Sequence, residues 1–179
     1  MAKSTRQYVF EGMELLPAAL IPFVEKRLES SLKGHWQLEV IQRVQGLRPN
    51  SAGEVGWDQQ GLLKTMMAFW KEAFATVLGH PERSYVSELL DVRNKLSHNE
   101  NFTYDDAERA LDSMRRLMEA ISAGEIAEQL AKTRDTILRT KFTELQRNEE
   151  RRKTQRLEIS VETVAGLLPW REVVEPHQD

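Results

Sequence analysis

The residues best suited to chemistry lie together in one stretch, LLDVRNKLSHNE, at residues 89–100. Its apolar positions have helical spacing, yet Arg93 stands among them, and Asn94 and His98 follow before the predicted helix ends. A buried guanidinium without a partner is very costly, so Arg93 requires an anion. That anion is either a carboxylate from another helix or the phosphate of a ligand.

The spacing of these residues decides which of them one helix can bring together. At 100° per residue, Arg93 falls near the middle of a broad apolar arc, and Asn94, His98 and Asp91 group on the far side. Asn94 and His98 are four residues apart and are therefore neighbours, whereas Arg93 and His98 are about 140° apart. Either the long arginine bends round the helix, or two copies of the helix face each other across a dimer. The apolar arc consists of Val86, Leu89, Leu90, Val92 and Leu96.

Taken alone, the residue types favour a structural interpretation of this stretch. In that interpretation Arg93 forms a salt bridge inside a helical bundle, and His98 ends a helix whose dipole stabilises the imidazolium. A role in catalysis requires more than composition and spacing.

The elements that position the stretch are predicted to be helices. An apolar stripe runs through residues 8–32, where Pro17 and Pro22 predict a kink or two consecutive helices. Residues 46–57 are rich in Gly, Pro and Asn and predict a loop. A second helix is expected over residues 58–78, with Asp58 as N-cap.

The motif helix is expected from about Glu82 to His98, after a break at Gly79 and Pro81. Thr103 then caps a fourth helix, and Asp106 at its third position completes a capping-box-like arrangement. These two helices and their short polar connection are expected to carry the candidate site.

The C-terminal third predicts a long helix and then a change of character. A helix over residues 124–156 would be about 45–50 Å long at 1.5 Å per residue, more than a small domain needs. Leu157, Ile159 and Val161 alternate with polar residues, which predicts a strand. We therefore divide the chain into a bundle (1–123), a long helix (124–156) and a strand-like tail (157–179) that leads into a further domain.

Composition excludes several classes of function. The 179 residues include no cysteine, so disulfides, thiol catalysis and cysteine-ligated zinc are excluded. A formal charge of −3, from 25 basic and 28 acidic residues, leaves no overall basic footprint for nucleic acid. The four histidines are scattered, and neither a P-loop nor a Gly-x-Ser-x-Gly elbow occurs, so no cofactor or metal is expected. Without a signal peptide or an apolar span, a cytoplasmic protein with no membrane contact is expected.

The hexapeptide RNKLSH, at residues 93–98, resembles the Arg-polar-x-x-x-His motif of the HEPN superfamily (higher eukaryotes and prokaryotes nucleotide-binding). Its setting is similar too, because it ends one helix and a long helix, YDDAERALDSMRRLMEAI, follows a short polar link. The segment MELLPAALIPFVEKRL and a tryptophan-led second helix resemble one branch of that superfamily. This branch occurs in large bacterial phage-defence (BREX-like) ATPases and in eukaryotic transcript-surveillance endoribonucleases. The tail LLPWREVVEPHQD looks like the segment that leads into the ATPase part of the bacterial proteins.

The resemblance implies an all-α bundle that forms a homodimer, with the motif helices meeting at a shared cleft. Many members are metal-independent RNA endoribonucleases, and others serve only as binding or dimerisation modules. By motif match, His98 is the implied general acid or base. Arg93 is the implied phosphate ligand, and Asn94 orients the histidine or binds a phosphate oxygen. Attack by the RNA 2′-hydroxyl would leave a 2′,3′-cyclic phosphate and a 5′-hydroxyl.

Overall fold

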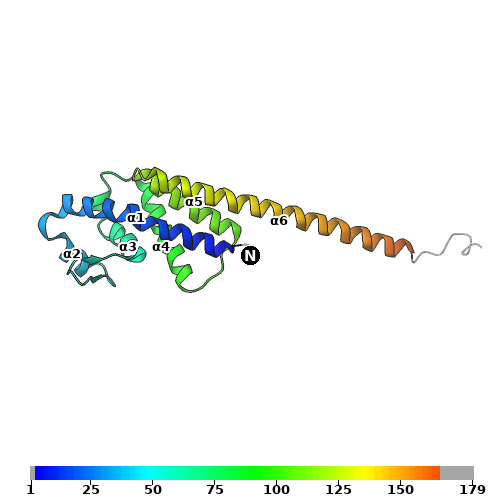
Figure 1. The fold of residues 1–179 in the computed structure, drawn as a ribbon, viewed down its shortest axis with the longest axis horizontal. Helices are drawn as coiled ribbons and strands as arrows, with labels where there is room; N and C mark the ends of the chain where they lie inside the picture. Colours follow the sequence, from blue (N-terminus) through cyan, green and yellow to red (C-terminus); the bar gives the residue numbers. More distant parts are fainter. Residues whose placement is uncertain (1–2, 166–179) are drawn as a thin grey trace, which may run out of the picture. The chain divides into compact units, whose positions relative to one another are not determined.

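A computed structural model describes residues 3–165, with the side chains of residues 3–32 and 34–155. The chain divides into two units, Met1–Leu138 and Arg139–Asp179. The elements, in chain order, are α1 (Thr5–Leu32), the 3₁₀ turn η1 (Lys33–His35), α2 (Trp36–Arg43), β1 (Arg48–Pro49), β2 (Val55–Gly56), α3 (Gln59–Ala68), the π-helical turn η2 (Trp70–Phe74), α4 (His80–Ser97), α5 (Tyr104–Ala120) and α6 (Gly124–Ala165). The prediction of an all-α bundle with a long C-terminal helix is confirmed (Figure 1).

The first unit is built around α1. Its buried residues recur every three or four positions and form one stripe, which packs against α3 and α5. Pro17 and Pro22 both lie inside this helix, so one helix forms where two consecutive helices were an alternative. Burial of the stripe offsets the backbone hydrogen bonds that the two prolines cannot donate. The stripe consists of Val9, Met13, Leu16, Leu20, Val24 and Leu28.

Close packing brings three helices together at Gly12 of α1. A Cβ atom at this position would lie 2.9 Å from Leu111 of α5 and 3.3 Å from Leu130 of α6. The glycine therefore permits a close approach of α1 to both helices. An ion pair at 2.6 Å between Arg134 and Glu108 also ties the first turns of α6 to α5.

The predicted caps at the starts of α3 and α5 are confirmed. The Asp58 carboxylate accepts a hydrogen bond from the Gly61 amide at 2.6 Å. The Thr103 hydroxyl accepts one from the Asp106 amide, while the Asp106 carboxylate accepts one from the Thr103 amide, both at 3.1 Å. These caps fix the ends of the two helices that pack on either side of α4.

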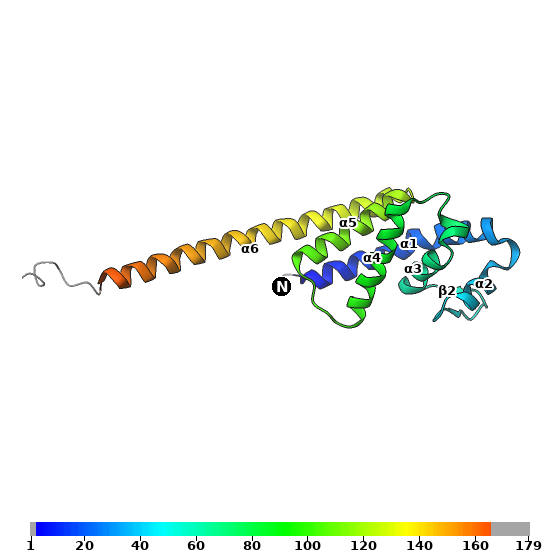
Figure 2. The ribbon, with the colours of Figure 1, turned by 180° about the vertical axis from the view of Figure 1, so that it is seen from behind.

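The second predicted helix is shorter than expected. α3 ends at Ala68, and the π-helical turn η2 follows, with Trp70 and Phe74 buried in the core. The predicted loop at 46–57 contains a small antiparallel hairpin in which Arg48 pairs with Gly56. η2 packs against α1, and β2 lies beside α2 (Figure 2).

The strand predicted at residues 157–161 is wrong, because α6 continues through this segment to Ala165. Leu157 and Val161 are also four residues apart, so the same positions suit a helix, and the preceding charged residues already form helical turns. The remainder of the predicted tail, residues 166–179, lies outside the described part. No helix within residues 3–165 combines the length and apolar character needed to cross a bilayer.

Candidate functional site

Arg93 lies on α4 beside the first residues of α3. Its Nη2 atom is 3.9 Å from Oδ2 of Asp58, and 28% of its side chain is exposed. The anion required by the sequence is therefore a carboxylate of the same chain. At 3.9 Å the pair is ionic but too long for a hydrogen bond, so the two groups are only loosely held.

Asn94 is exposed on the next position of α4, close to the same end of α3. Its side-chain oxygen accepts a long hydrogen bond, 3.4 Å, from Nε2 of Gln60. Arg93 and Asn94 therefore both contact the first turn of α3. The contact of the two residues with α3 was not expected from the sequence, because it depends on how α3 and α4 pack.

His98 occupies the C-terminal cap of α4 and is exposed. Its amide donates to the Asn94 carbonyl at 3.1 Å, so the two residues lie one helical turn apart on the same face of α4. Asn99 follows with a φ of 55°, in the left-handed region. Its amide donates to Leu96, and the Glu100 amide donates to Lys95. This pair of bonds is the Schellman motif, which gives the turn carrying His98 a defined backbone.

The first turn of α1 contacts the same end of α4. Nη2 of Arg6 donates to the Leu96 carbonyl at 2.9 Å and to the Asn99 side chain at 2.7 Å. The Thr5 hydroxyl donates to the Phe102 carbonyl at 2.6 Å. Figures 1 and 2 show the start of α1 beside the α4–α5 connection. The sequence offers one weak signal for this contact, since a cation in a first helical turn opposes the helix dipole and needs another partner.

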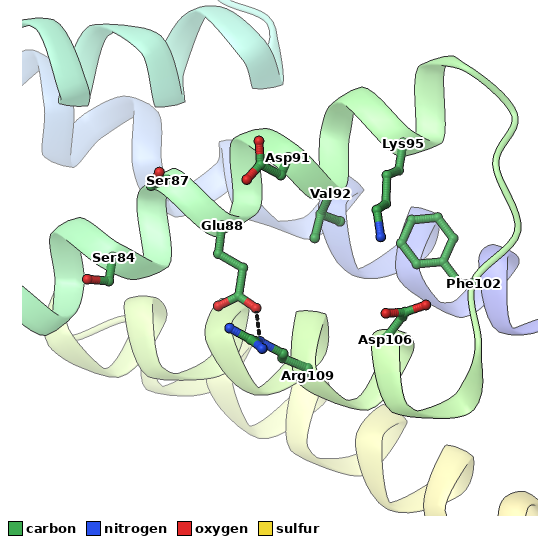
Figure 3. A pocket seen from close by; sticks show the side chains of 9 residues that line it. All are labelled: Ser84, Ser87, Glu88, Asp91, Val92, Lys95, Phe102, Asp106 and Arg109. Atoms are coloured by element: carbon green, nitrogen blue, oxygen red, sulfur yellow. Dashed lines mark hydrogen bonds and ion pairs between the residues drawn. The ribbon is translucent and has the colours of Figure 1, made fainter.

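A groove of about 500 Å³ runs between α4 and α5, along α4 from Ser84 to Lys95. Val92 and Phe102 form a nearly buried apolar floor. Figure 3 shows Lys95 reaching between these two residues toward Asp106. The residues that line the groove are Ser84, Ser87, Glu88, Asp91, Val92, Lys95, Phe102, Asp106 and Arg109.

The charges in this groove are largely paired within the chain. Glu88 accepts hydrogen bonds from Arg109 and, at 2.8 Å, from the Ser113 hydroxyl. The amide of Thr103, which donates to Asp106, lowers the pKa of that carboxyl, and the charge of Lys95 adds to the effect. With three carboxylates and two cations in its lining, the groove is not a basic channel for a phosphate backbone.

Asn94 lies between the other two predicted site residues. It shares one face of α4 with His98, as the wheel predicts, and it contacts the start of α3 as Arg93 does. Within the described residues, no side-chain hydrogen bond or ion pair joins any two of the three. One copy of the chain thus presents an amide and an imidazole together, with the guanidinium at a separate position.

Comparison with known protein families identifies the family to which the chain belongs. The family model for the Swt1-like HEPN domain matches residues 11–122, which run from the first turns of α1 to the end of α5. No curated protein and no solved structure gives a significant match to the chain. Because the match spans more than half of the sequence and includes the whole of α4, the chain belongs to the Swt1-like HEPN family.

Proposed function

We propose that this HEPN domain is an RNA endoribonuclease that acts as a two-fold dimer and requires no metal ion. His98 serves as general acid or base, Arg93 binds the scissile phosphate, and Asn94 orients the imidazole or donates to a phosphate oxygen. The phage-defence or toxin-like setting and an ATPase domain in the same protein stay predictions of the sequence resemblance.

The observation that carries this proposal is the exposure of His98 and Asn94 on one face of α4, at a helix end with a fixed backbone. The Schellman motif, a common helix ending, fixes the backbone of the turn that carries His98. A general acid or base must reach the proton it transfers, and its effectiveness depends on a defined position. The exposure of the His98 imidazole supports access to the proton, and the Schellman motif supports a defined position of the residue.

Arg93 has the character of a phosphate ligand with a replaceable partner. Its guanidinium is part-exposed, and Asp58 is 64% exposed and 3.9 Å away. The other Asp58 oxygen already caps α3 through Gly61. A phosphate with two oxygens in reach of the guanidinium fork would form shorter, charge-assisted bonds than this carboxylate does.

The reaction follows from the RNA itself. The 2′-oxygen attacks phosphorus as its proton passes to a basic imidazole, and the bond from phosphorus to the 5′-oxygen breaks as that oxygen receives a proton. The products are a 2′,3′-cyclic phosphate and a 5′-hydroxyl. A dimer supplies a second copy of each motif residue, which removes the need for Arg93 and His98 of one helix to meet.

A catalytically silent module for dimerisation or partner binding is the second candidate. The ion pair between Arg93 and Asp58 favours it, because an arginine satisfied within its own chain needs no phosphate. The two candidates differ in what they predict for RNA. Only the first predicts cleavage that depends on the 2′-hydroxyl.

The experiment uses a single-stranded RNA labelled at its 5′ end and a matched strand with one 2′-deoxy nucleotide at the scissile position. The proposal predicts cleavage of the RNA in the presence of EDTA, no cleavage at the deoxy position, and a 2′,3′-cyclic phosphate on the product. Cleavage at the deoxy position, or a 5′-phosphate product, would contradict the mechanism. Binding of RNA without any cleavage would favour the silent module.

A further inference from the structure

One arginine outside the motif holds both sides of the turn that carries His98. Nη2 of Arg6 donates to the carbonyl of Leu96, two residues before His98, and to the side chain of Asn99, one residue after it. The distances are 2.9 and 2.7 Å, so both hydrogen bonds are short. Arg6, which lies on α1 and is distant in sequence, thus binds the chain on both sides of His98.

The Arg6 contacts coincide with the hydrogen bonds that end α4. The Leu96 carbonyl accepts from the Asn99 amide as well as from Arg6. The Asn99 side chain, which Arg6 holds, belongs to the residue in the left-handed conformation. Loss of Arg6 would therefore leave the Leu96 carbonyl with backbone donors alone and release the side chain of the residue that reverses the chain after His98.

The Arg6 side chain is half-buried, and its hydrogen bond to Asn99 lies at the surface. The Nε atom of Arg6 is buried and has no hydrogen-bond partner among the described residues. An unpaired buried N–H group is unfavourable, so the contacts of Nη2 must compensate for it. A cation is also stabilised beside the carbonyl end of α4 by the helix dipole.

We infer that Arg6 is a positioning residue for His98, acting through the last turn of α4 and making no contact with RNA. This inference rests on the proposed ribonuclease function for its catalytic consequence. Arg6 precedes residue 11, where the family match begins, so the match does not include this contact.

The test compares Arg6→Gln with a control arginine on the same helix. Arg27 also donates to a carbonyl and a side-chain oxygen, those of Ala73 at 3.0 Å and Thr76 at 2.9 Å, but it contacts the η2 region and not α4. Arg27→Gln therefore removes the same chemical group from α1 and leaves the His98 turn intact. Thermal melting of both variants measures their effect on the whole fold.

Two readouts separate positioning from general stability. Hydrogen exchange of the Asn99 and Glu100 amides should become about tenfold faster or more in Arg6→Gln, because their bonds open locally. The kcat for RNA cleavage should fall about 10- to 100-fold, the scale of a catalytic group displaced by roughly 1 Å, with KM nearly unchanged. Arg27→Gln should change neither, and Arg6→Lys should recover part of both because it retains a donor.

A second variant, Asn99→Gly, keeps a residue that tolerates the left-handed φ and removes only the side chain that Arg6 binds. Its kcat should fall by less than that of Arg6→Gln, and kcat alone is compared for this variant because glycine also relieves the strain of a side chain at this φ. This comparison decides the question if Arg6→Gln does not fold. Unchanged exchange at residues 99 and 100, or an unchanged kcat in an active protein, would overturn the inference. If the parent chain does not cleave RNA, the proposed function fails, and the exchange comparison alone decides whether Arg6 holds the turn.

Discussion

Arg93 and Asp58 face each other between α4 and α3, with Nη2 3.9 Å from Oδ2. The same carboxylate uses its other oxygen to cap α3 through the Gly61 amide at 2.6 Å. Asp58 therefore has two roles, and its role as a partner of Arg93 is the weaker one. An anion that binds Arg93 has to compete only with this long contact.

Replacement of Asp58 by Asn separates the two roles. Asn is as good an N-cap as Asp, so α3 should retain its cap, and the free energy of unfolding should change by less than about 1 kcal/mol. If Arg93 binds phosphate, loss of the competing charge should leave RNA affinity equal or higher, measured by fluorescence anisotropy with inactive His98→Ala protein. Weaker binding of Asp58→Asn would contradict this, and a large loss of stability would favour a structural salt bridge.

Substitution of Arg93 by Lys keeps the charge and removes the planar fork. We expect kcat for RNA cleavage to fall about 10-fold or more, since a lysine cannot grip two phosphate oxygens in the same geometry. Arg83→Lys is the matched control, because Arg83 is an exposed arginine on the same helix. Equal activity of the two variants would remove Arg93 from the proposed site.

The proposed dimer makes a prediction for the exposed face of α4. Sedimentation of the parent chain should show a dimer whose interface buries roughly 1,200 Å² or more in total. Ser87→Arg places a bulky cation on this face and should produce a monomer without cleavage activity. Ser30→Arg, on the exposed part of α1, is the control and should remain a dimer. A parent chain that is monomeric at high micromolar concentration would contradict a two-fold site.

The capping box after the His98 turn predicts a dependence of stability on pH. The Thr103 amide lowers the pKa of Asp106, so this carboxylate stabilises the fold above the unfolded pKa of about 3.9. The contribution is lost as the pH falls through the lower pKa of the folded state. Asp106→Asn should therefore lower the free energy of unfolding by about 0.5 kcal/mol at pH 7 and by less below about pH 3.9.

Urea unfolding at pH 7 and pH 3 measures this difference. Asp135→Asn, on an exposed position inside α6, is the control and should change neither value appreciably. A deficit for Asp106→Asn that is as large at pH 3 as at pH 7 would mean that its charge does not support the cap.

The features that depend on local sequence were predictable. Asp58 and Thr103 cap their helices as expected, because an N-cap is formed by residues within one turn. The wheel also places Asn94 and His98 on one face. By contrast, the alternation at 157–161 is short enough to suit a strand or a helix, and the continuation of α6 decides for the helix.

The features that depend on packing were not predictable. The contact of Arg6 with Leu96 joins residues 90 positions apart, and nothing in either segment specifies the other. The partner of Arg93 was predicted only as an anion, and the choice of Asp58 follows from the packing of α3 on α4. The break of the second helix at η2 likewise follows from burial of Trp70 and Phe74 in the core.

Single-turnover cleavage of RNA by His98→Ala and His80→Ala tests whether His98 is the general acid or base. His80 is an exposed histidine at the opposite end of the same helix, so the two variants remove the same group from α4. We expect His98→Ala to lower the rate by about 10²- to 10⁴-fold, the usual contribution of a general acid or base, with its melting temperature unchanged. His80→Ala should cleave at the parent rate. A folded His98→Ala protein that cleaves RNA as fast as the parent would show that His98 is not the general acid or base.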